Sequence, residues 1–221
     1  MSAVCRPCCL FWYLYLSHLL ADYPLQFDAL MLFKDRWWGR ALHVGVHFAV
    51  LLLIVGPSRR ALWPYLLTLS AVHFVLDGGK SWLSRRKPLW VAGPYLLDQL
   101  LHLLVILLVV AWIRVTLPAT LLPPDRRWPV YAGGFLLATC VWYVTERVLA
   151  HDHEDYLREV IAQRWPRMLA RAGLLTLFLL SLRLVSSQIL TVVGMLPLLG
   201  LALYVPYLSG SHRRRALATD V

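Results

Sequence analysis

Long runs of apolar residues restrict this 221-residue chain to very few folds. A helix needs about 20 apolar residues to cross the hydrocarbon layer of a bilayer, and runs of this kind cover most of the sequence. Hydrophobic residues make up 59% of the chain and charged residues only 15%, a composition that excludes a soluble enzyme. The sequence therefore predicts an all-α fold, a polytopic bundle of transmembrane helices.

Charged residues, Pro and Gly divide the apolar sequence into about seven predicted spans. The spans are expected near residues 8–27, 41–56, 61–78, 94–117, 129–149, 172–187 and 189–208. The last two form one apolar stretch, which could also be a single span or a re-entrant segment. Basic residues concentrate in the loops after the odd-numbered spans, which predicts an outer N-terminus and a cytoplasmic C-terminus.

The net charge of +10 does not indicate nucleic-acid binding, because the Lys and Arg residues lie mainly in the loops between apolar runs. Apolar residues recur at helical spacing among charged residues near 151–171, although Pro166 interrupts the pattern. This segment is interpreted as an interfacial helix, with a simple connector as the alternative. We expect two parts, a four-helix domain over residues 1–117 and C-terminal helices over 118–221.

Each of the first four apolar segments carries one pair of potential metal ligands, separated by four positions. The pairs are His18 with Asp22, His43 with His47, His73 with Asp77, and Asp98 with His102. A spacing of four places both side chains on one face of a helix. Since the pairs lie late in inward-running spans and early in outward-running spans, all four are expected at one level of the bundle.

The pairs also form an internal repeat with a constant offset of 55 positions. His18 corresponds to His73, Asp22 to Asp77, His43 to Asp98, and His47 to His102. The repeated unit is a helical hairpin, and two parallel copies are expected to be related by a twofold axis along the membrane normal. Such symmetry predicts one shared site on the axis or two equivalent sites.

Ionisable groups are costly within a membrane, so they are expected to face the bundle interior and to pair with one another or with an ion. Imidazole and carboxylate groups together are ligands for a divalent transition metal: zinc, or alternatively manganese, iron or nickel. We expect one or two ions held by the eight residues. Four further residues are candidates for positioning, anion binding or proton transfer, namely Gln26, Lys80, Gln99 and Glu146.

Other interpretations of the polar layer stay open at this point. A relay for protons or ions could use the same residues without a metal, and polar residues in membrane helices also pack structurally. A haem held by two histidines would leave the aspartates unexplained.

The chain resembles a bacterial inner-membrane family catalogued as a domain of unknown function. The resemblance rests on four helix motifs over roughly residues 10–110: His18-x3-Asp22-x3-Gln26, His43-x3-His47, His73-x3-Asp77-x2-Lys80 and Asp98-Gln99-x2-His102. It implies a multi-pass protein of the inner membrane and candidate site residues, but no activity. More distantly, the layout is similar to membrane-bound metal-dependent hydrolases.

Two functions are compatible with this sequence. The first is a metal-dependent hydrolase that acts on a lipid or lipid-linked substrate at the cytoplasmic leaflet. The second is a transporter or channel for metal ions or protons, which would use the same polar layer. The layer is expected near one membrane surface rather than at the midplane, which favours the hydrolase. The sequence is compatible with a homo-oligomer.

Overall fold

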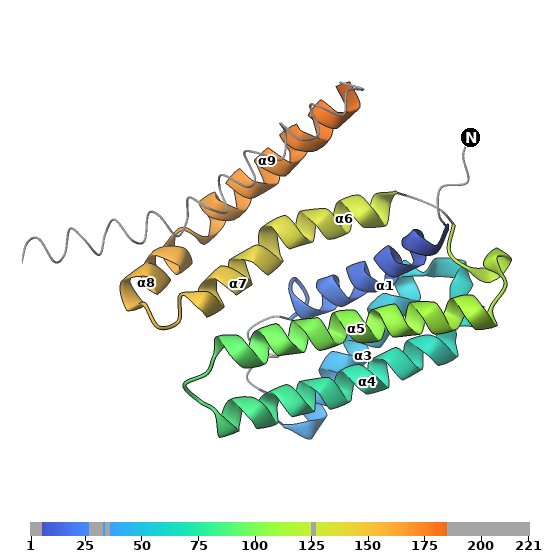
Figure 1. The fold of residues 1–221 in the computed structure, drawn as a ribbon, viewed down its shortest axis with the longest axis horizontal. Helices are drawn as coiled ribbons and strands as arrows, with labels where there is room; N and C mark the ends of the chain where they lie inside the picture. The colour runs from blue at the N-terminus through green and yellow to red at the C-terminus, as the bar shows by residue number, and fades with distance from the viewer. Residues whose placement is uncertain (1–5, 27–32, 34–35, 125–126, 185–221) are drawn as a thin grey trace, which may run out of the picture. The chain divides into compact units, whose positions relative to one another are not determined.

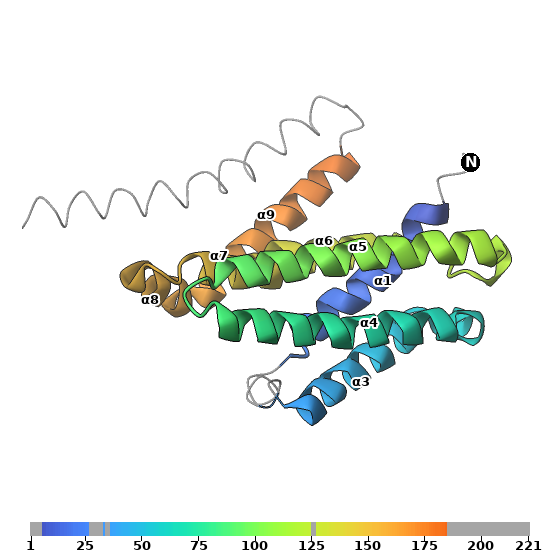
Figure 2. The ribbon, with the colours of Figure 1, turned by 60° about the horizontal axis from the view of Figure 1, so that its bottom comes forward.

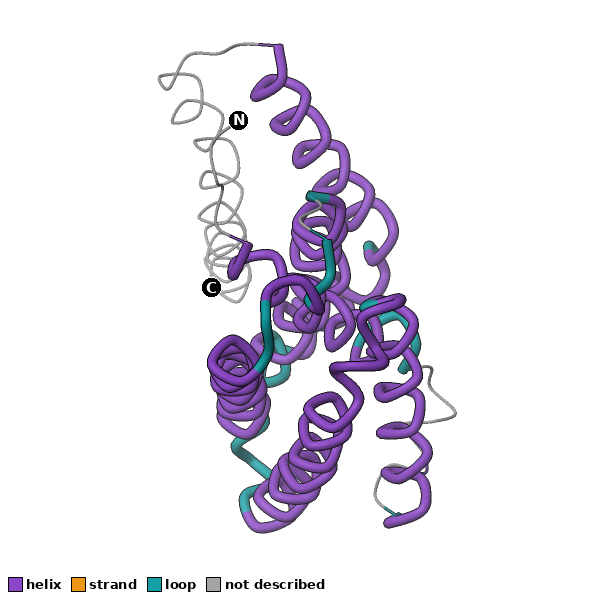
Figure 3. The backbone as a smooth tube through the Cα atoms, turned by 90° about the vertical axis from the view of Figure 1, so that its right-hand side faces the viewer, coloured by secondary structure: helices purple, strands orange, loops and turns teal. Residues whose placement is uncertain are grey.

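The computed structural model describes residues 6–26, 33, 36–124 and 127–184. The described residues form helices joined by turns and loops, with no strand among them, which confirms the predicted all-α class (Figure 3). The chain divides into two compact units, Met1–Leu149 and Ala150–Val221.

The first unit contains a bundle of four helices (Figure 1). They are α1 (Arg6–Asp22), α3 (Trp37–Ile54), α4 (Arg59–Arg86) and α5 (Ala92–Thr116). Consecutive helices of the bundle pack against each other, and α5 returns to α1 to close the bundle. Figure 2 shows α3, α4 and α5 from a second direction. The four helices overlap the first four predicted spans.

Glycine and proline set the ends of these helices. Gly56 has a φ of +59°, a conformation that favours glycine, and it turns the chain from α3 into α4. Leu117 is extended before Pro118, as expected for a residue that precedes proline, and α5 ends there. In the same way α1 ends just before the Tyr23–Pro24 bond, so the helix is shorter than the predicted span 8–27.

The fifth predicted span, 129–149, is helical throughout but not uniform. It consists of α6 (Trp128–Leu136), a π-helical segment (Leu137–Val141) and α7 (Trp142–Leu149). Helix α6 packs against α1. The first compact unit extends to Leu149 and includes these helices together with the four-helix bundle.

The second unit begins with α8 (Glu154–Ala162) and α9 (Arg164–Leu184). The expected interfacial helix near 151–171 is therefore divided between two helices. Pro166 lies in the first turn of α9, where the missing N–H is tolerated. Helix α9 covers the predicted span 172–187 as far as Leu184, and the span 189–208 lies outside the described residues.

An apolar core fills one end of the four-helix bundle. It comprises Leu10, Leu14, Leu51, Val55, Leu62, Leu66, Leu69, Ile106, Val109, Val110 and Ile113. On each of the four helices the predicted ligand pair lies next to these residues, toward the other end of the bundle. The ligand pairs therefore continue the inner face of each helix beyond the apolar core.

Two of the described helices, α3 and α5, are long and apolar enough to cross a membrane, judged by length and composition. Helix α1 has 17 residues, and α4 carries Arg, Asp and Lys side chains along its 28 residues.

Leu66 and Leu67 allow a matched test of the apolar core. Leu66 is fully buried, whereas Leu67 is 49% exposed. We expect Leu66→Ala to lower the free energy of unfolding by about 2–5 kcal/mol, because it leaves a cavity in the core. Leu67→Ala should change it by less than about 0.5 kcal/mol. Denaturant unfolding of both variants in detergent measures the difference, and equal effects would contradict the assignment of the core.

Candidate metal centre

The bundle brings the eight residues of the four predicted pairs into its interior, with one pair from each helix. Seven of them are at most 4% exposed, and the side chain of Asp22 is 8% exposed. A buried polar side chain needs a partner, since leaving it without one costs about 1–3 kcal/mol. The contacts within the layer show which partners the protein itself supplies.

Four side-chain atoms from three helices lie close together, with the Nε2 atoms of His43 and His73 each near a carboxylate oxygen of Asp22 and of Asp77. Nε2 of His43 lies 3.1 Å from Nε2 of His73 and 3.2 Å from Oδ1 of Asp22. Nε2 of His73 lies 3.6 Å from the same oxygen of Asp22. Oδ2 of Asp77 lies 3.6 Å from Nε2 of His43 and 3.7 Å from Nε2 of His73. Asp22, His43 and His73 form one group of possible metal ligands whose atoms all lie within 4.8 Å of one another, and His73, Asp77 and His102 form another.

The distances among these atoms are in the range that a transition-metal site requires. Bonds of about 2.1 Å from zinc to nitrogen or oxygen place the ligands of a tetrahedral site about 3.4 Å apart. The five distances of 3.1–3.7 Å given above bracket that value. Two imidazoles and two carboxylates are also a suitable donor set, since the carboxylates neutralise a divalent cation. We call these four residues the His₂Asp₂ group.

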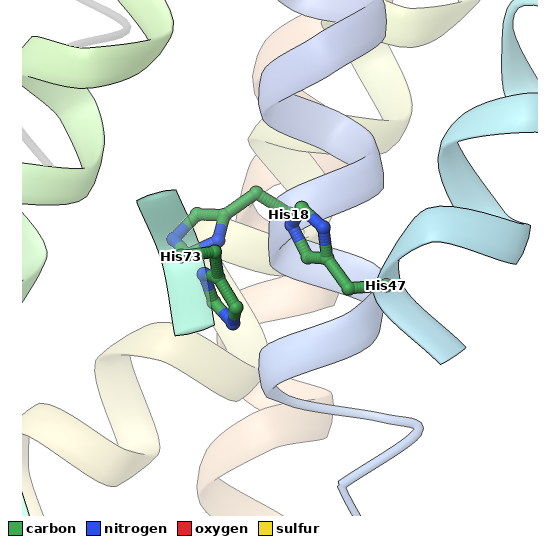
Figure 4. Close-up of side chains that lie close together, drawn as sticks. All are labelled: His18, His47 and His73. Carbon is green, nitrogen blue, oxygen red and sulfur yellow. The ribbon is translucent and has the colours of Figure 1, made fainter. Parts of the chain in front are cut away.

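A second set of ligands is made of imidazoles alone. The rings of His18, His47 and His73 gather between α1, α3 and α4 (Figure 4), and their nitrogen atoms lie within 4.8 Å of one another. Together with His102 they line a cavity of about 10 Å³, which aliphatic side chains complete. A cavity of about this volume holds one water-sized particle. His73 belongs to both sets.

Several ring nitrogens of the layer have no hydrogen-bond partner among the described residues. For His47, which is 1% exposed, this is true of both ring nitrogens. It is also true of Nδ1 of His18, His43 and His73 and of Nε2 of His102. A neutral imidazole normally donates from one nitrogen and accepts at the other. The unpartnered nitrogens of His18, His47 and His102, which line the imidazole cavity, are therefore suited to metal coordination.

A hydrogen bond to the backbone determines which ring nitrogen of His102 has a free lone pair. Nδ1 of His102 lies 2.8 Å from the carbonyl oxygen of Asp98, so Nδ1 carries the proton and donates it to that oxygen. Nε2 of His102 is then the nitrogen with the free lone pair, and it lines the imidazole cavity. Metal-bound histidines are commonly oriented in this way by a carbonyl oxygen.

The predicted repeat is visible in the geometry of the rings. His18 stacks on His102 with a centroid distance of 4.9 Å and an interplanar angle of 16°. The corresponding rings, His73 and His47, stack at 4.3 Å and 13°. In the first helix of each hairpin a ring nitrogen lies 3.7 Å from the Asp carboxylate, although it is Nδ1 in His18 and Nε2 in His73. These relations are those expected of two hairpins around a local twofold axis.

The symmetry breaks where Asp98 stands in place of His43. At the position that corresponds to Leu25, the second copy has Lys80. Nζ of Lys80 donates a hydrogen bond to Oδ2 of Asp98 over 2.7 Å. Burial would lower the pKa of Lys80, but attraction to the Asp98 carboxylate outweighs burial and raises that pKa. Lys80 is therefore charged and neutralises Asp98, which lies outside the three candidate ligand groups of the described residues.

A network of hydroxyl and amide groups surrounds the ion pair and was not predicted from the sequence. Gln99 donates to Asp98 over 3.2 Å and accepts a hydrogen bond from the Tyr23 hydroxyl over 3.0 Å. The hydroxyl of Tyr95 lies 3.1 Å from that of Tyr23 and 2.8 Å from Oγ1 of Thr145 on α7. The spacing of Tyr23, Tyr95 and Thr145 along the sequence gives no signal for this network, because the three side chains come from different segments of the chain.

Two other candidates occupy different positions. Gln26 lies beyond the end of α1, because Pro24 prevents the helix from continuing. It is therefore not one further helical turn from Asp22, as the motif had suggested. Glu146 is buried on α7, next to the Thr145 that bonds Tyr95. Neither residue belongs to the candidate ligand groups of the described chain.

The pair of Lys80 and Asp98 can be tested by a double-mutant cycle. Lys80→Met should lower the free energy of unfolding by about 2 kcal/mol, less than for a fully buried pair because the Lys80 side chain is 31% exposed. The double variant Lys80→Met/Asp98→Asn should be more stable than the sum of the single losses predicts. Thermal unfolding in detergent measures both.

The exposed pair of Arg158 and Glu154 provides the control, since its side chains are 75% and 84% exposed. Arg158→Met should cost less than about 1 kcal/mol. Additive losses in the cycle of Lys80 and Asp98 would show that the two residues do not neutralise each other.

Comparison with known proteins identifies a family but no activity. No curated protein and no solved structure matches the chain. A family model described as "Protein of unknown function (DUF3307)" matches residues 10–124. This match confirms the expected domain of unknown function, covers more than half of the chain and includes all eight residues of the His/Asp layer. The chain belongs to the DUF3307 family.

Proposed function

We propose that this chain is a multi-pass membrane protein with a His/Asp metal centre, and that it is a metal-dependent hydrolase. Its substrate would be a lipid or a lipid-linked molecule, reached from the cytoplasmic leaflet of the inner membrane. The observation that carries the proposal is the His₂Asp₂ group, in which the Nε2 atoms of His43 and His73 lie 3.1 Å apart and 3.2–3.7 Å from carboxylate oxygens of Asp22 and Asp77.

The distribution of side chains supports a membrane location. The interior of the four-helix bundle holds the His/Asp layer, whereas large apolar side chains cover its outside. On α5 the exposed residues include Leu96, Leu100, Leu104, Leu107, Leu108 and Val115. A soluble protein rarely exposes a continuous apolar face of this size, but a membrane helix does so when its polar residues face the bundle.

The His₂Asp₂ group would hold the ion through His43, His73, Asp22 and Asp77. Zinc, manganese, iron and nickel all accept this donor set. A bound ion would polarise a substrate oxygen and lower the pKa of a bound water, which is the chemistry that hydrolysis requires. The imidazole cavity, with room for about one water-sized particle, is the candidate position for that water or for a second ion.

The apolar core favours hydrolysis over transport. A transporter or channel that used the same layer would need a polar route through both ends of the bundle. At the end beyond the ligand pairs, the core is closed by residues such as Leu14, Leu51, Leu62 and Leu66, each at most 1% exposed. A centre that is closed on one side is suited to a substrate that arrives and leaves at the same membrane surface.

The remaining candidates would support the centre from its edge. Gln99 fixes the Asp98 carboxylate, and Lys80 provides its counter-charge. Buried Glu146 is the proposed proton acceptor. Gln26, close in sequence to the end of α1, would contact substrate.

Elemental analysis of the detergent-purified protein tests the metal centre. We expect at least one equivalent of transition metal per chain, and its loss in Asp77→Ala and His73→Ala. His151→Ala is the matched control, because His151 is exposed and should leave the metal content unchanged. Less than about half an equivalent in the unaltered protein, unchanged in Asp77→Ala, would refute the centre.

Activity in proteoliposomes tests the hydrolase. Phospholipid and polyprenyl phosphate are the first substrates to offer, with released product as the measurement. We expect hydrolysis by the metal-loaded protein and a loss of at least about 100-fold in Asp77→Ala, because the ion supplies the nucleophile. Metal or proton flux without hydrolysis would instead establish the transporter.

A further inference from the structure

Arg40 is a cation at the edge of the proposed metal centre and is not one of its proposed ligands. It lies on α3 three residues before His43, one helical turn from the His₂Asp₂ group. Its side chain is half-buried, and its Nε atom is buried without a hydrogen-bond partner among the described residues. No carboxylate of the described chain forms an ion pair with it. A guanidinium in such a position normally has an anionic partner.

Helix α4 holds the Arg40 side chain in place. The guanidinium carbon lies 5.4 Å from the centre of the Phe74 ring, a cation–π contact. Gly78 provides the space beside it, because a Cβ atom at that position would lie only 2.7 Å from Nη1 of Arg40. Gly78 directly follows Asp77, one of the proposed metal ligands. The arginine fork is therefore fixed beside the centre rather than extended freely into solvent.

The balance of charges in the His/Asp layer indicates the charge of the ligand that would bind beside it. Asp22 and Asp77 together balance one divalent cation, and Lys80 balances Asp98. Among the described residues, Arg40 then has no carboxylate that forms an ion pair with it. In a poorly hydrated region an isolated charge is costly, so the loaded centre is complementary to a ligand with a negative charge.

The shape of the Arg40 guanidinium group indicates which class of anion it would bind. Arginine presents several N–H donors in a planar fork that matches the oxygens of a phosphate group, and such paired bonds are among the strongest hydrogen bonds. We propose that Arg40 binds a phosphate-type oxyanion of the substrate at the edge of the metal centre. This inference rests on the proposed function for the neighbouring ion, and it assigns the substrate to the class of phosphate-bearing molecules.

A phosphorus NMR titration of the metal-loaded protein with inorganic phosphate tests the assignment. Arg40→Gln should weaken binding at least about tenfold, and Arg40→Lys should have an intermediate effect because it keeps the charge but loses the fork. Gly78→Ala should weaken binding several-fold while the total charge is unchanged, since the new methyl group displaces the guanidinium. Gly79→Ala is the matched control, because a Cβ there meets nothing within 4 Å.

The source of the phosphate is distinguished by a second titration in nanodiscs. If phosphatidic acid competes with inorganic phosphate and phosphatidylcholine nanodiscs do not, the bound group belongs to a lipid. If phosphatidic acid does not compete, the site takes a soluble phosphate, and the assignment of Arg40 still holds. Equal phosphate binding in the unaltered protein, Arg40→Gln and Gly78→Ala would overturn it.

Metal content, measured on the same samples, separates this inference from the proposed function. All four variants should retain their metal, because none removes a proposed ligand. Retained metal with phosphate binding that does not depend on Arg40 refutes the inference alone. Absence of metal from every sample refutes the metal centre, and Arg40-dependent phosphate binding would then still support the anion site.

Discussion

The structure depends on satisfying polar side chains that have been removed from water. Seven of the eight residues in the His/Asp layer are nearly inaccessible, and an apolar core lies directly beside them. Part of the free-energy cost of burying these side chains is offset by the ion pair of Lys80 with Asp98 and by the hydrogen bond from His102 to the backbone. Imidazole and carboxylate atoms of the layer also form three groups that could hold a metal ion. A divalent cation at one of these groups would neutralise the carboxylate charge and use the lone pairs of the imidazoles.

The sequence alone predicted the convergence of these residues but not their division of roles. A spacing of four places two ligands on one helix face, and antiparallel helices bring such faces to one level, so periodicity was sufficient for the layer. Periodicity could not show that Asp98 would bond Lys80, because that choice depends on distances between α4 and α5. The hydroxyl network of Tyr23, Tyr95 and Thr145 was missed for the same reason. The span predicted for α1 was too long, because the prediction gave too little weight to the helix-ending effect of Pro24.

The two hairpins have diverged by a pair of compensating changes. The step from His43 to Asp98 adds a negative charge, and the step from Leu25 to Lys80 adds a positive one. Nζ of Lys80 lies 2.7 Å from Oδ2 of Asp98, so the second hairpin itself supplies the positive charge that balances Asp98. The first hairpin keeps an imidazole, and its Asp22 and His43 form a ligand group with His73 from the second hairpin. The two copies of the repeat therefore contribute different ligands to the layer.

The position of the apolar core determines what such a centre can do. Burying one large aliphatic side chain contributes about 1.5–3 kcal/mol, so a polar path through a core with eleven residues would cost many times that amount. Opening the other end of the bundle disturbs none of these residues, and there the layer is bordered by Lys80, Arg40 and the tyrosine hydroxyls. A substrate that enters from this end meets cations and hydrogen-bond donors before it meets the proposed ion. This order suits an amphipathic molecule whose anionic group lies at the membrane surface, and a reaction that returns its product to the same surface.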